Sequence, residues 1–415
     1  MVIPSIDLMD GKVVQLKQGR EKVLERDDAA GLLRGFDRFG ETAIVDLNAA
    51  MDRGDNREAI RLLLKHGDGR IGGGIRDLAS ARKFISWGAN KIIVGSRAFE
   101  GDRVDHGFLS ALSAGVGPDR LIVAIDARQG HVVTRAWTHD TGLDLFAVLQ
   151  ECARYCGEFL YTCVEKEGCL SGTDIATVTR LAAATDRRIT VAGGITSLDD
   201  IRELSRLGVN CQLGMALYTG RIDLADAFIE SLDWSKGLIP TIAQDESGRV
   251  LTLAFSSRES LKNIFATGEM WYFSRSRNEL WHKGGTSGYT QEFIRIRPDC
   301  DCDALLVRVR PKGPACHTGD YSCFGGRTFG LDDLLEVIRD RLADPRPGSS
   351  YTARLTDGLL KEKIMEEAAE VTAARSRDEI VWEISDVVYF LTVLMAKNGL
   401  GYADITAELR RRRWQ

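Results

Sequence analysis

The first ~225 residues contain an internal repeat, and this repeat constrains the fold more than any other feature of the chain. Ile6-Asp7 recurs as Ile125-Asp126, and each pair is followed by a glycine and a Val-Val pair. Gly73-Gly74-Ile75 recurs as Gly193-Gly194-Ile195, at nearly the same separation of about 120 residues. Because two similar halves of alternating strands and helices close naturally into a ring, the repeat predicts a (βα)8 barrel rather than a doubly wound open sheet.

Hydrophobic patterning divides the chain into three predicted domains. In the first, buried parallel strands are expected at 3–8, 43–47, 91–94, 121–126, 160–164, 189–191 and 211–213, with helices at 78–87 and 198–207. Residues 233–240 form a plausible connection to a mainly β segment at 250–324. Helical periodicity follows from 331 to 413, interrupted at Asp344-Pro345-Arg346-Pro347-Gly348. We therefore expect domains at 1–230, 231–327 and 328–415.

Composition excludes several classes of protein. The formal net charge is −5, which argues against a general nucleic-acid-binding surface. No apolar run approaches the ~18 residues of a membrane span, and the N-terminus resembles a strand rather than a signal peptide. There are nine cysteines, for which metal binding or inert thiols are expected before disulfides. The chain is thus expected to be a cytoplasmic enzyme that binds neither nucleic acid nor membrane.

The repeat also places two aspartates in equivalent positions. Asp7 and Asp126 fall at the carboxyl ends of opposite barrel strands, where catalytic groups of such barrels lie, so they suit a general base and a general acid. Glycines could let backbone amides approach two phosphates at opposite rims, and the alternative is loop geometry alone. These glycines are Gly73, Gly74, Gly95, Gly193, Gly194 and Gly214.

The middle segment contains a candidate metal centre. Alternate aspartates on a strand would share one face, and Asp299, Asp301 and Asp303 so placed would suit Mg²⁺. Thiolates prefer zinc, and a set of three leaves an open position for a catalytic water; the cysteines are Cys300, Cys316 and Cys323. The alternative is a solvated acidic turn with unreactive cysteines.

The C-terminal segment carries five carboxylates at helical spacing. They sit among apolar neighbours, which suggests Mg²⁺ ions that grip a pyrophosphate, although an exposed charged stripe is the alternative. The five are Glu366, Glu367, Glu370, Glu383 and Asp386.

The middle segment strongly resembles phosphoribosyl-AMP cyclohydrolase. The resemblance rests on Ser274-Arg275-Ser276-Arg277, Lys283-Gly284, Thr286-Ser287-Gly288, Asp299-Cys300-Asp301 with Asp303, Gly313-Pro314-Ala315-Cys316-His317-Thr318-Gly319 and Ser322-Cys323-Phe324. It implies that Cys300, Cys316 and Cys323 hold zinc, shared between two chains of a homodimer, and that the three aspartates hold Mg²⁺. Zinc hydroxide would then attack C6 of the purine and open the ring. His317 becomes a catalytic candidate, and Arg275, Arg277, Lys283, Thr286 and Ser287 become substrate-binding candidates. Gly285 departs from the family, which usually has glutamate there.

The C-terminal segment resembles phosphoribosyl-ATP pyrophosphohydrolase, of the all-α pyrophosphatase superfamily. The resemblance rests on Ser350-Tyr351-Thr352-Ala353-Arg354-Leu355, Lys363-Ile364 and the five carboxylates. It implies Mg²⁺-assisted release of pyrophosphate, and the product is the substrate of the cyclohydrolase.

The barrel resembles the isomerase that acts on the ring-opened ribotide. Matching pieces include Ile3-Pro4, Ile6-Asp7-Leu8, Gly72-Gly73-Gly74-Ile75-Arg76, Ala124-Ile125-Asp126, Tyr161-Thr162 and Leu170-Ser171-Gly172. They imply an Amadori rearrangement, with Asp7 as base, Asp126 as acid and Thr162 as a hydrogen-bonding group. Several substrate-positioning residues depart from the family: Gln15, Asn48-Ala49-Ala50, Cys163, Glu167 and Met215.

Three functional readings follow from these resemblances. The first is a three-step histidine-biosynthesis enzyme that takes phosphoribosyl-ATP, phosphoribosyl-AMP and the ring-opened ribotide in turn. The second is a bifunctional cyclohydrolase and pyrophosphohydrolase with an inactive scaffold barrel. A regulatory nucleotide-binding protein with dead sites is the third. The sequence also leaves open a barrel that accepts phosphoribosyl anthranilate.

Overall fold

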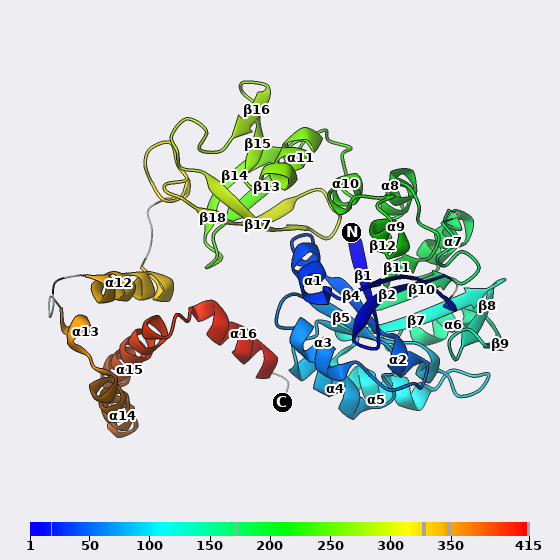
Figure 1. Cartoon of the computed structure of the whole chain (residues 1–415), viewed down its shortest axis with the longest axis horizontal. Helices are drawn as coiled ribbons and strands as arrows, with labels where there is room; N and C mark the ends of the chain where they lie inside the picture. The colour runs from blue at the N-terminus through cyan, green and yellow to red at the C-terminus, as the bar shows by residue number, and fades with distance from the viewer. Residues whose placement is uncertain (18, 171, 326–328, 345, 347–349, 413–415) are drawn as a thin grey trace. The chain divides into compact units, whose positions relative to one another are not determined.

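The computed structural model describes the chain except residues 18, 171, 326–328, 345, 347–349 and 413–415. Ser171 of the isomerase-like segment, and Pro345, Pro347 and Gly348 of the predicted helix interruption, lie outside the described residues. The described chain forms two compact units, Met1–Phe324 and Gly325–Arg412 (Figure 1).

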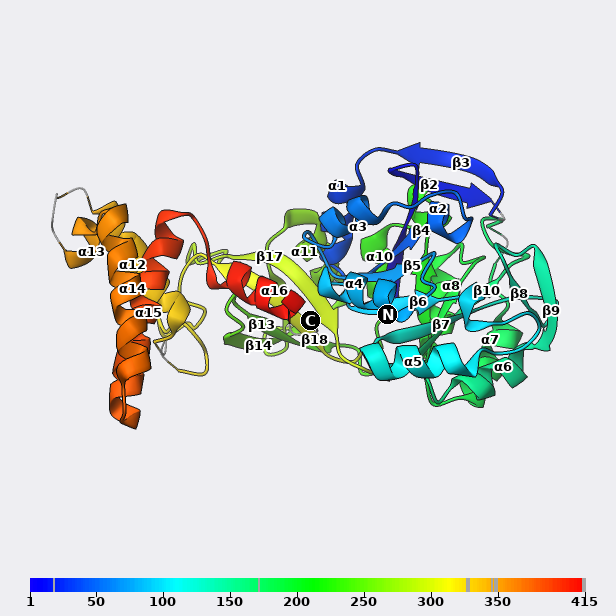
Figure 2. The ribbon, with the colours of Figure 1, turned by 90° about the horizontal axis from the view of Figure 1, so that it is seen from below.

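Eight parallel strands close into a barrel, as the repeat predicts. Around the ring they are β1 (Val2–Met9), β4 (Thr42–Asp46), β5 (Gly69–Gly72), β6 (Lys91–Val94), β7 (Leu121–Arg128), β10 (Glu158–Cys163), β11 (Arg188–Ala192) and β12 (Asn210–Leu213). Pairing of β1 with β12 and of β7 with β10 closes the ring. The two halves match closely, because β1 and β7 each continue into an antiparallel hairpin. These hairpins are β2 (Lys12–Lys17) with β3 (Glu21–Arg26), and β8 (His131–Thr134) with β9 (His139–Asp144) (Figure 2).

Helices surround the barrel, and aspartates begin most of them. They are α1 (Ala29–Asp37), α2 (Leu47–Ala50), α3 (Arg57–Leu63), α4 (Leu78–Ser86), α5 (His106–Val116), α6 (Leu145–Cys152), α7 (Ile175–Ala184), α8 (Leu198–Arg206), α9 (Met215–Tyr218) and α10 (Leu224–Glu230). Asp77, Asp105 and Asp174, for example, each accept a hydrogen bond from a backbone amide of the first turn. Such caps satisfy amides that have no partner within the helix.

Charged side chains fill the amino-terminal end of the barrel. Arg70 is almost fully buried and donates to Glu158 at 2.5 Å and to Glu41 at 2.6 Å. Lys91 donates to Glu158 at 2.6 Å. Because each buried charge here has an opposite partner, this end is closed by a satisfied ion network.

The middle segment forms a mixed sheet beside the barrel. Its strand order is β14 (Val250–Ser256), β13 (Ile239–Gln244), β18 (Leu305–Pro311) and β17 (Gln291–Pro298), with α11 (Arg258–Thr267) and the hairpin of β15 (Trp271–Ser274) and β16 (Glu279–His282). β13 begins at Ile239, within the predicted connection. Phe39 and Phe228 of the barrel pack against Phe265 of α11, so both segments share one apolar core.

The second unit is helical, as expected. It contains α12 (Leu331–Ala343), α13 (Tyr351–Arg354), α14 (Asp357–Ala373), α15 (Arg377–Lys397) and α16 (Tyr402–Arg412). A small core joins α12, α14 and α15 through Ile338, Leu360, Phe390 and Val393. The division into domains at 230 and 327 stays a prediction.

Candidate functional sites

Asp7 and Asp126 lie in the interior of the barrel, near the ends of β1 and β7. The Ser5 hydroxyl donates to Asp7 Oδ1 at 2.8 Å. Trp137, in the loop between β8 and β9, donates from its indole Nε1 to Asp126 Oδ2 at 2.9 Å. Thr162 of β10 is the register neighbour of Asp126 and hydrogen-bonds to it. Burial raises the pKa of Asp7 to about 6 and also raises the pKa of Asp126.

A third carboxylate, Glu167, joins this pair. Burial, reinforced by the charges of Asp7 and Asp126, raises the pKa of Glu167 to about 7. Its Oε2 atom is buried and has no hydrogen-bond partner. That oxygen lies beside the backbone of Gly193, because a Cβ built there would meet it at 2.8 Å. Three carboxylates therefore lie close enough at the barrel mouth to affect one another's protonation.

A cavity of about 70 Å³ opens between Asp7 and the Gly193 rim. Gly193, Gly194 and Gly214 line it, as expected for the second rim. None of the described lining residues is a lysine, arginine or histidine, and the polar side chains that line it are Ser5, Asp7, Gln15, Glu167 and Gln212. A phosphate in this cavity would lie beside the carboxylates of Asp7 and Glu167, with no cation among the described lining residues.

The first rim owes its glycines to close packing. Gly73 has φ +91°, and a Cβ there would lie 2.1 Å from the Asp46 carbonyl oxygen. Gly74 packs against Ala49, where a Cβ would lie 2.3 Å from the methyl carbon. Gly95 precedes a short 3-10 turn at Ser96–Ala98. These contacts support the loop-geometry alternative for Gly73 and Gly74, whereas phosphate binding at this rim stays a prediction.

We expect Glu167→Gln to stabilise the protein increasingly as pH rises. Glutamate ordinarily titrates near 4.5 but here near 7, so between these values the folded state holds a proton that the unfolded state releases. Folding stability contributed by this group is therefore lost as pH rises from about 4.5 to 7. At pH 8 the variant should be more stable by up to about 3 kcal/mol. Urea denaturation at pH 4.5 and 8 checks this, with Glu165→Gln as the control; an equal difference at both pH values contradicts it.

In the middle segment, Cys316 and Cys323 lie together. The Thr318 hydroxyl donates to Cys316 Sγ at 3.0 Å, and this hydrogen bond is the main cause that lowers the pKa of Cys316. Cys323 also hydrogen-bonds to Cys316 and donates to Thr252 Oγ1 at 3.4 Å. Lys283 is only 5% exposed, and its charge is attracted to both thiols, although burial lowers its pKa. A lowered thiol pKa favours the thiolate, the form that binds metal.

Cys300 does not join this pair within one chain. It is exposed, and its thiol contacts Asp301 Oδ1 at 4.0 Å. Among the described residues, the three cysteines form no group whose ligand atoms all lie within 4.8 Å of one another. His317 Nδ1 lies 3.8 Å from Cys316 Sγ. A single copy of the chain therefore does not gather the three predicted ligands into one group.

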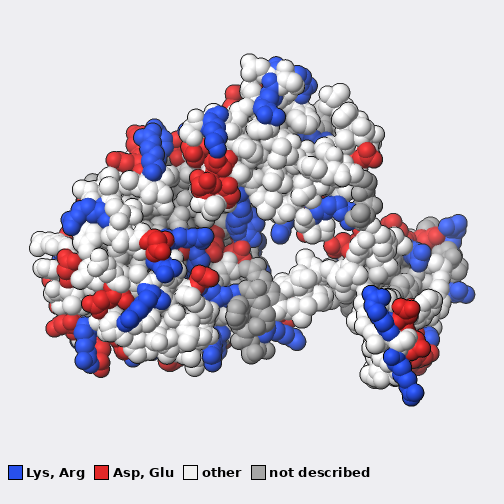
Figure 3. Space-filling model, turned by 180° about the vertical axis from the view of Figure 1, so that it is seen from behind, with Lys and Arg blue, Asp and Glu red and all other residues white. Residues whose placement is uncertain are grey.

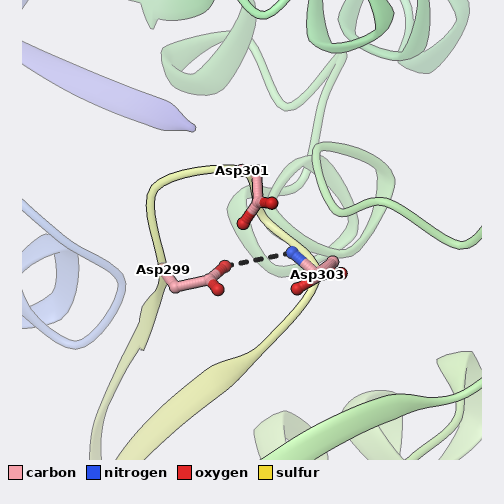
Figure 4. A group of neighbouring side chains, drawn as sticks. All are labelled: Asp299, Asp301 and Asp303. Atoms are coloured by element: carbon pink, nitrogen blue, oxygen red, sulfur yellow. Dashed lines mark hydrogen bonds between the residues drawn. The ribbon is translucent and has the colours of Figure 1, made fainter.

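The three aspartates do come together, but the predicted strand at 299–303 is wrong. The segment is the loop between β17 and β18. Asp299 Oδ1 accepts from the Asp303 and Ala304 amides, and Cys302 has φ +64°, so the chain turns back (Figure 4). The carboxylates of Asp299, Asp301 and Asp303 offer ligand atoms within 4.8 Å of one another. Lys236 donates to Asp303 at 2.6 Å and offsets part of their charge.

The remaining candidates of this segment lie on the surface. The Arg275 guanidinium stacks 3.7 Å from the centroid of the Phe255 ring, and Arg277 pairs with Glu279 at 3.2 Å. Thr286 and Ser287 lie exposed in the turn after β16. Their role in substrate binding stays a prediction.

In the helical unit, three of the five carboxylates converge. Glu367 of α14 and Glu383 and Asp386 of α15 offer ligand atoms within 4.8 Å of one another. Burial and neighbouring carboxylates raise the pKa values of Glu367 and Glu383. Glu370 hydrogen-bonds to Glu383, whereas Glu366 is outside the group and pairs at 2.8 Å with Lys363, which also lies 3.7 Å from Glu367. Glu383 Oε2 is buried without a partner, which is unlike an exposed charged stripe.

Other sequence expectations concern the whole surface and the other cysteines. Burial raises the pKa values of Cys152 and Cys156 to about 12, as expected for inert thiols.

Acidic and basic side chains lie intermixed over the barrel face shown in Figure 3. No helix among the described residues has the length and apolar character to cross a membrane. The cytoplasmic location stays a prediction.

One residue that contacts a barrel aspartate, Trp137, escaped the sequence interpretation. Trp137 approaches Asp126 because Arg135, Ala136 and Trp137 all adopt positive φ angles, which no sequence pattern signalled. Glu167, by contrast, was interpreted as a possible replacement for the usual aspartate of the isomerase family, and the structure brings its charge close to those of Asp7 and Asp126.

Known families match the three segments in order. Residues 1–223 match the histidine biosynthesis protein family, 252–325 phosphoribosyl-AMP cyclohydrolase and 331–413 phosphoribosyl-ATP pyrophosphohydrolase. The histidine biosynthesis bifunctional protein HisIE of Halalkalibacterium halodurans is 46% identical over 197 residues, covering 43% of this chain and 92% of that protein. The proteins of the same name from Pyrococcus furiosus and Bacillus subtilis are 42% and 46% identical, covering 45% and 42% of this chain and 98% and 91% of those proteins. The chain therefore belongs to the histidine biosynthesis protein family, with a phosphoribosyl-AMP cyclohydrolase domain and a phosphoribosyl-ATP pyrophosphohydrolase domain following its barrel.

Proposed function

We propose that this protein catalyses two consecutive hydrolytic steps of histidine biosynthesis. The helical unit releases pyrophosphate from phosphoribosyl-ATP, and the middle domain opens the adenine ring of the resulting phosphoribosyl-AMP. The observation that carries this proposal is the pairing of Cys316 and Cys323 beside buried Lys283, in a chain that also gathers Glu367, Glu383 and Asp386.

The residues of the middle domain fit zinc. Cys316 and Cys323 supply two soft ligands, and the lowered pKa of Cys316 favours its thiolate. Cys300 lies apart, which supports a site completed by Cys300 of a second copy and hence a homodimer. When bound, zinc supplies a hydroxide at neutral pH by lowering the pKa of its water to about 7. Lys283 would place a positive charge beside the anionic substrate.

Mg²⁺ is the second proposed cofactor. Asp299, Asp301 and Asp303 supply hard oxygen ligands on one loop, and Glu367, Glu383 and Asp386 supply them between two helices. In each group the carboxylates repel one another, so a divalent cation would relieve the repulsion. The helical group would orient the phosphates for hydrolysis.

A coupled assay tests the two-step proposal. Full-length protein supplied with phosphoribosyl-ATP and both metals should release pyrophosphate first, and the ring-opened ribotide should appear after a lag. A zinc chelator should stop ring opening while pyrophosphate release continues. Ring opening that persists at full rate in metal-free protein would refute the zinc assignment.

We propose further that the barrel does not isomerise the ring-opened ribotide. That substrate carries two phosphates, and the second rim presents Glu167 and Asp7 with no cation among its described lining residues. Full-length protein supplied with the ring-opened ribotide should therefore form no more ketose than its Asp7→Asn variant. Turnover that Asp7→Asn abolishes would establish a third activity and overturn this part.

A further inference from the structure

The loop between β17 and β18 carries four of the predicted metal ligands, namely Asp299, Cys300, Asp301 and Asp303. Within the loop, Asp299 Oδ1 accepts from the amides of Asp303 and Ala304 (Figure 4). The Cys300 thiol is exposed and contacts the neighbouring Asp301 at 4.0 Å. Bonds inside the loop shape its turn, whereas the direction in which the loop presents Cys300 depends on what holds its two ends.

The barrel holds the β17 end of this loop. Asp68, just before β5, accepts hydrogen bonds from Arg295 and, at 3.1 Å, from Arg297. Between these two arginines, the Ile296 amide donates to the Arg38 carbonyl oxygen at 2.8 Å. The side chains of Asp68 and both arginines are only 19–27% exposed, and ion pairs in such partly buried positions are screened less than surface pairs. These contacts fix the last residues of β17 before the loop begins.

The turn that leaves the barrel holds the other end of the loop. The Asp233 amide donates to the Cys302 carbonyl oxygen at 2.9 Å, and Lys236 donates to Asp303 at 2.6 Å. The Cys302 side chain packs against the apolar core that the barrel and the middle domain share. Lys236 is 73% exposed, so its ion pair contributes little, and the partly buried contacts of Asp68 and Cys302 supply most of the restraint.

Restraint of this loop matters for a zinc site that two copies share. Cys300 is not grouped with Cys316 and Cys323 in its own chain, so it adds to a site only across the boundary between copies. Ordering the backbone of one residue on binding lowers affinity about 5- to 30-fold. A loop that is ordered beforehand avoids this loss and therefore binds the ion more tightly.

We propose that Asp68 of the barrel is a positioning residue for the shared zinc site. It holds the β17 end of the loop so that Cys300 is already ordered when a second copy meets it. The inference rests on the proposed function, because it requires a zinc site shared between two copies. It gives the barrel a part in ring opening that does not depend on isomerisation.

The zinc affinity of the full-length protein measures this role directly. Competition with a chromophoric chelator should show that Asp68→Ala weakens zinc binding about 5- to 30-fold. At saturating zinc, the variant should open the ring of phosphoribosyl-AMP at close to the wild-type maximal rate, because its metal ligands are unchanged. Its release of pyrophosphate from phosphoribosyl-ATP should equal that of the wild type.

Glu230→Ala is the matched control. Glu230 of α10 pairs with Arg258 of α11 across the same boundary between the barrel and the middle domain, and its side chain is 18% exposed. Both Glu230→Ala and Asp68→Ala should lower the unfolding temperature, but only Asp68→Ala should lower the zinc affinity. Arg297→Ala should weaken zinc binding as well. Adding Asp68→Ala to Arg297→Ala should then cost less affinity than Asp68→Ala costs alone, since the two residues act as a pair.

Each remaining outcome is decisive. Thermal unfolding establishes which variants are folded, and Arg297→Ala decides by the same criterion if Asp68→Ala is not. Unchanged zinc affinity in the folded variant overturns this inference and leaves the hydrolytic proposal standing. Equal weakening by Glu230→Ala also overturns it, because the barrel then acts only through general stability. A wild-type protein that binds no zinc refutes the zinc assignment and, with it, this inference.

Discussion

Replacing Cys316 by serine is expected to abolish ring opening of phosphoribosyl-AMP while pyrophosphate release continues. The serine hydroxyl stays protonated at neutral pH, whereas the Thr318 hydrogen bond favours the Cys316 thiolate. Loss of this ligand should cost at least about a thousandfold in rate, or ~4 kcal/mol of transition-state stabilisation. The absorbance change on ring opening measures the rate, and elemental analysis measures the zinc content.

Cys302→Ser is the matched control for this prediction. Cys302 lies on the same loop as Cys300 but packs against the core of the middle domain, so its replacement should preserve both zinc content and rate. A folded Cys316→Ser protein that opens the ring at the normal rate would contradict the assignment.

Mixing two inactive variants tests whether the zinc site is shared. Cys300→Ser and Cys316→Ser should each be inactive, because Cys300 lies apart from Cys316 and Cys323 within one chain. In a twofold heterodimer of these variants, one of the two shared sites keeps all three cysteines. Unfolding and refolding an equal mixture should therefore restore about a quarter of the wild-type activity. No recovery, despite proven heterodimers, would place the site within a single chain.

The barrel could be predicted from its repeat because closure follows from the number and spacing of its strands. The strand at Gly69–Gly72 was not predicted, since half of it is glycine and it lacks the β-branched run that marks its neighbours. Its place became certain only through pairing with β4 and β6. Tertiary pairing therefore decided what local pattern could not.

For the two carboxylate clusters, the sequence predicted which residues take part better than it predicted how they are arranged. Asp299, Asp301 and Asp303 converge as expected, yet they do so on a loop held by Asp299 rather than on one face of a strand. In the helical unit, periodicity grouped Glu366 with Glu370, but Glu366 lies outside the cluster and forms the shorter of the two ion pairs of Lys363, at 2.8 Å against 3.7 Å for Glu367. Spacing along a helix identifies shared faces, whereas competition from a neighbouring cation depends on side-chain position in space.

Of the three candidate sites, the barrel mouth was the one whose charge and hydrogen bonding the sequence predicted least well. Gln15, Glu167 and Met215 stood out as departures from the isomerase pattern, each considered by itself. Only the fold brings all three to one cavity and leaves Glu167 Oε2 without a donor beside Gly193. Gln15 and Met215 are 152 and 48 positions away from Glu167 in the chain, and barrel closure places all three around the same cavity.

Glu383→Gln is expected to raise the unfolding temperature of the metal-free helical unit and to slow its release of pyrophosphate. The substitution keeps the shape of the side chain and removes one of the charges that crowd Glu367, Asp386 and Glu370. Without metal, the variant should unfold at a higher temperature than the wild type, because repulsion is relieved and an unpartnered buried oxygen is no longer ionised. With Mg²⁺, it should release pyrophosphate at least about a hundredfold more slowly.

The opposite signs of these two effects distinguish a metal site from a surface stripe. Glu362→Gln, on the same helix as Glu367 but outside the cluster, should change neither the unfolding temperature nor the rate. Added Mg²⁺ should raise the unfolding temperature of the helical unit in the wild type and in Glu362→Gln, but not in Glu383→Gln, since a unit is stabilised only by an ion that it binds in its folded state. The other proposed Mg²⁺ site, at Asp299, Asp301 and Asp303, lies in the other unit, so the transition of the helical unit is the one to follow. Equal Mg²⁺ stabilisation of all three proteins would show that Glu383 is not a ligand, whatever the activity measurement gives. Carboxylates gathered for a divalent ion are expected to destabilise the protein while the site is empty and to stabilise it when the ion is bound.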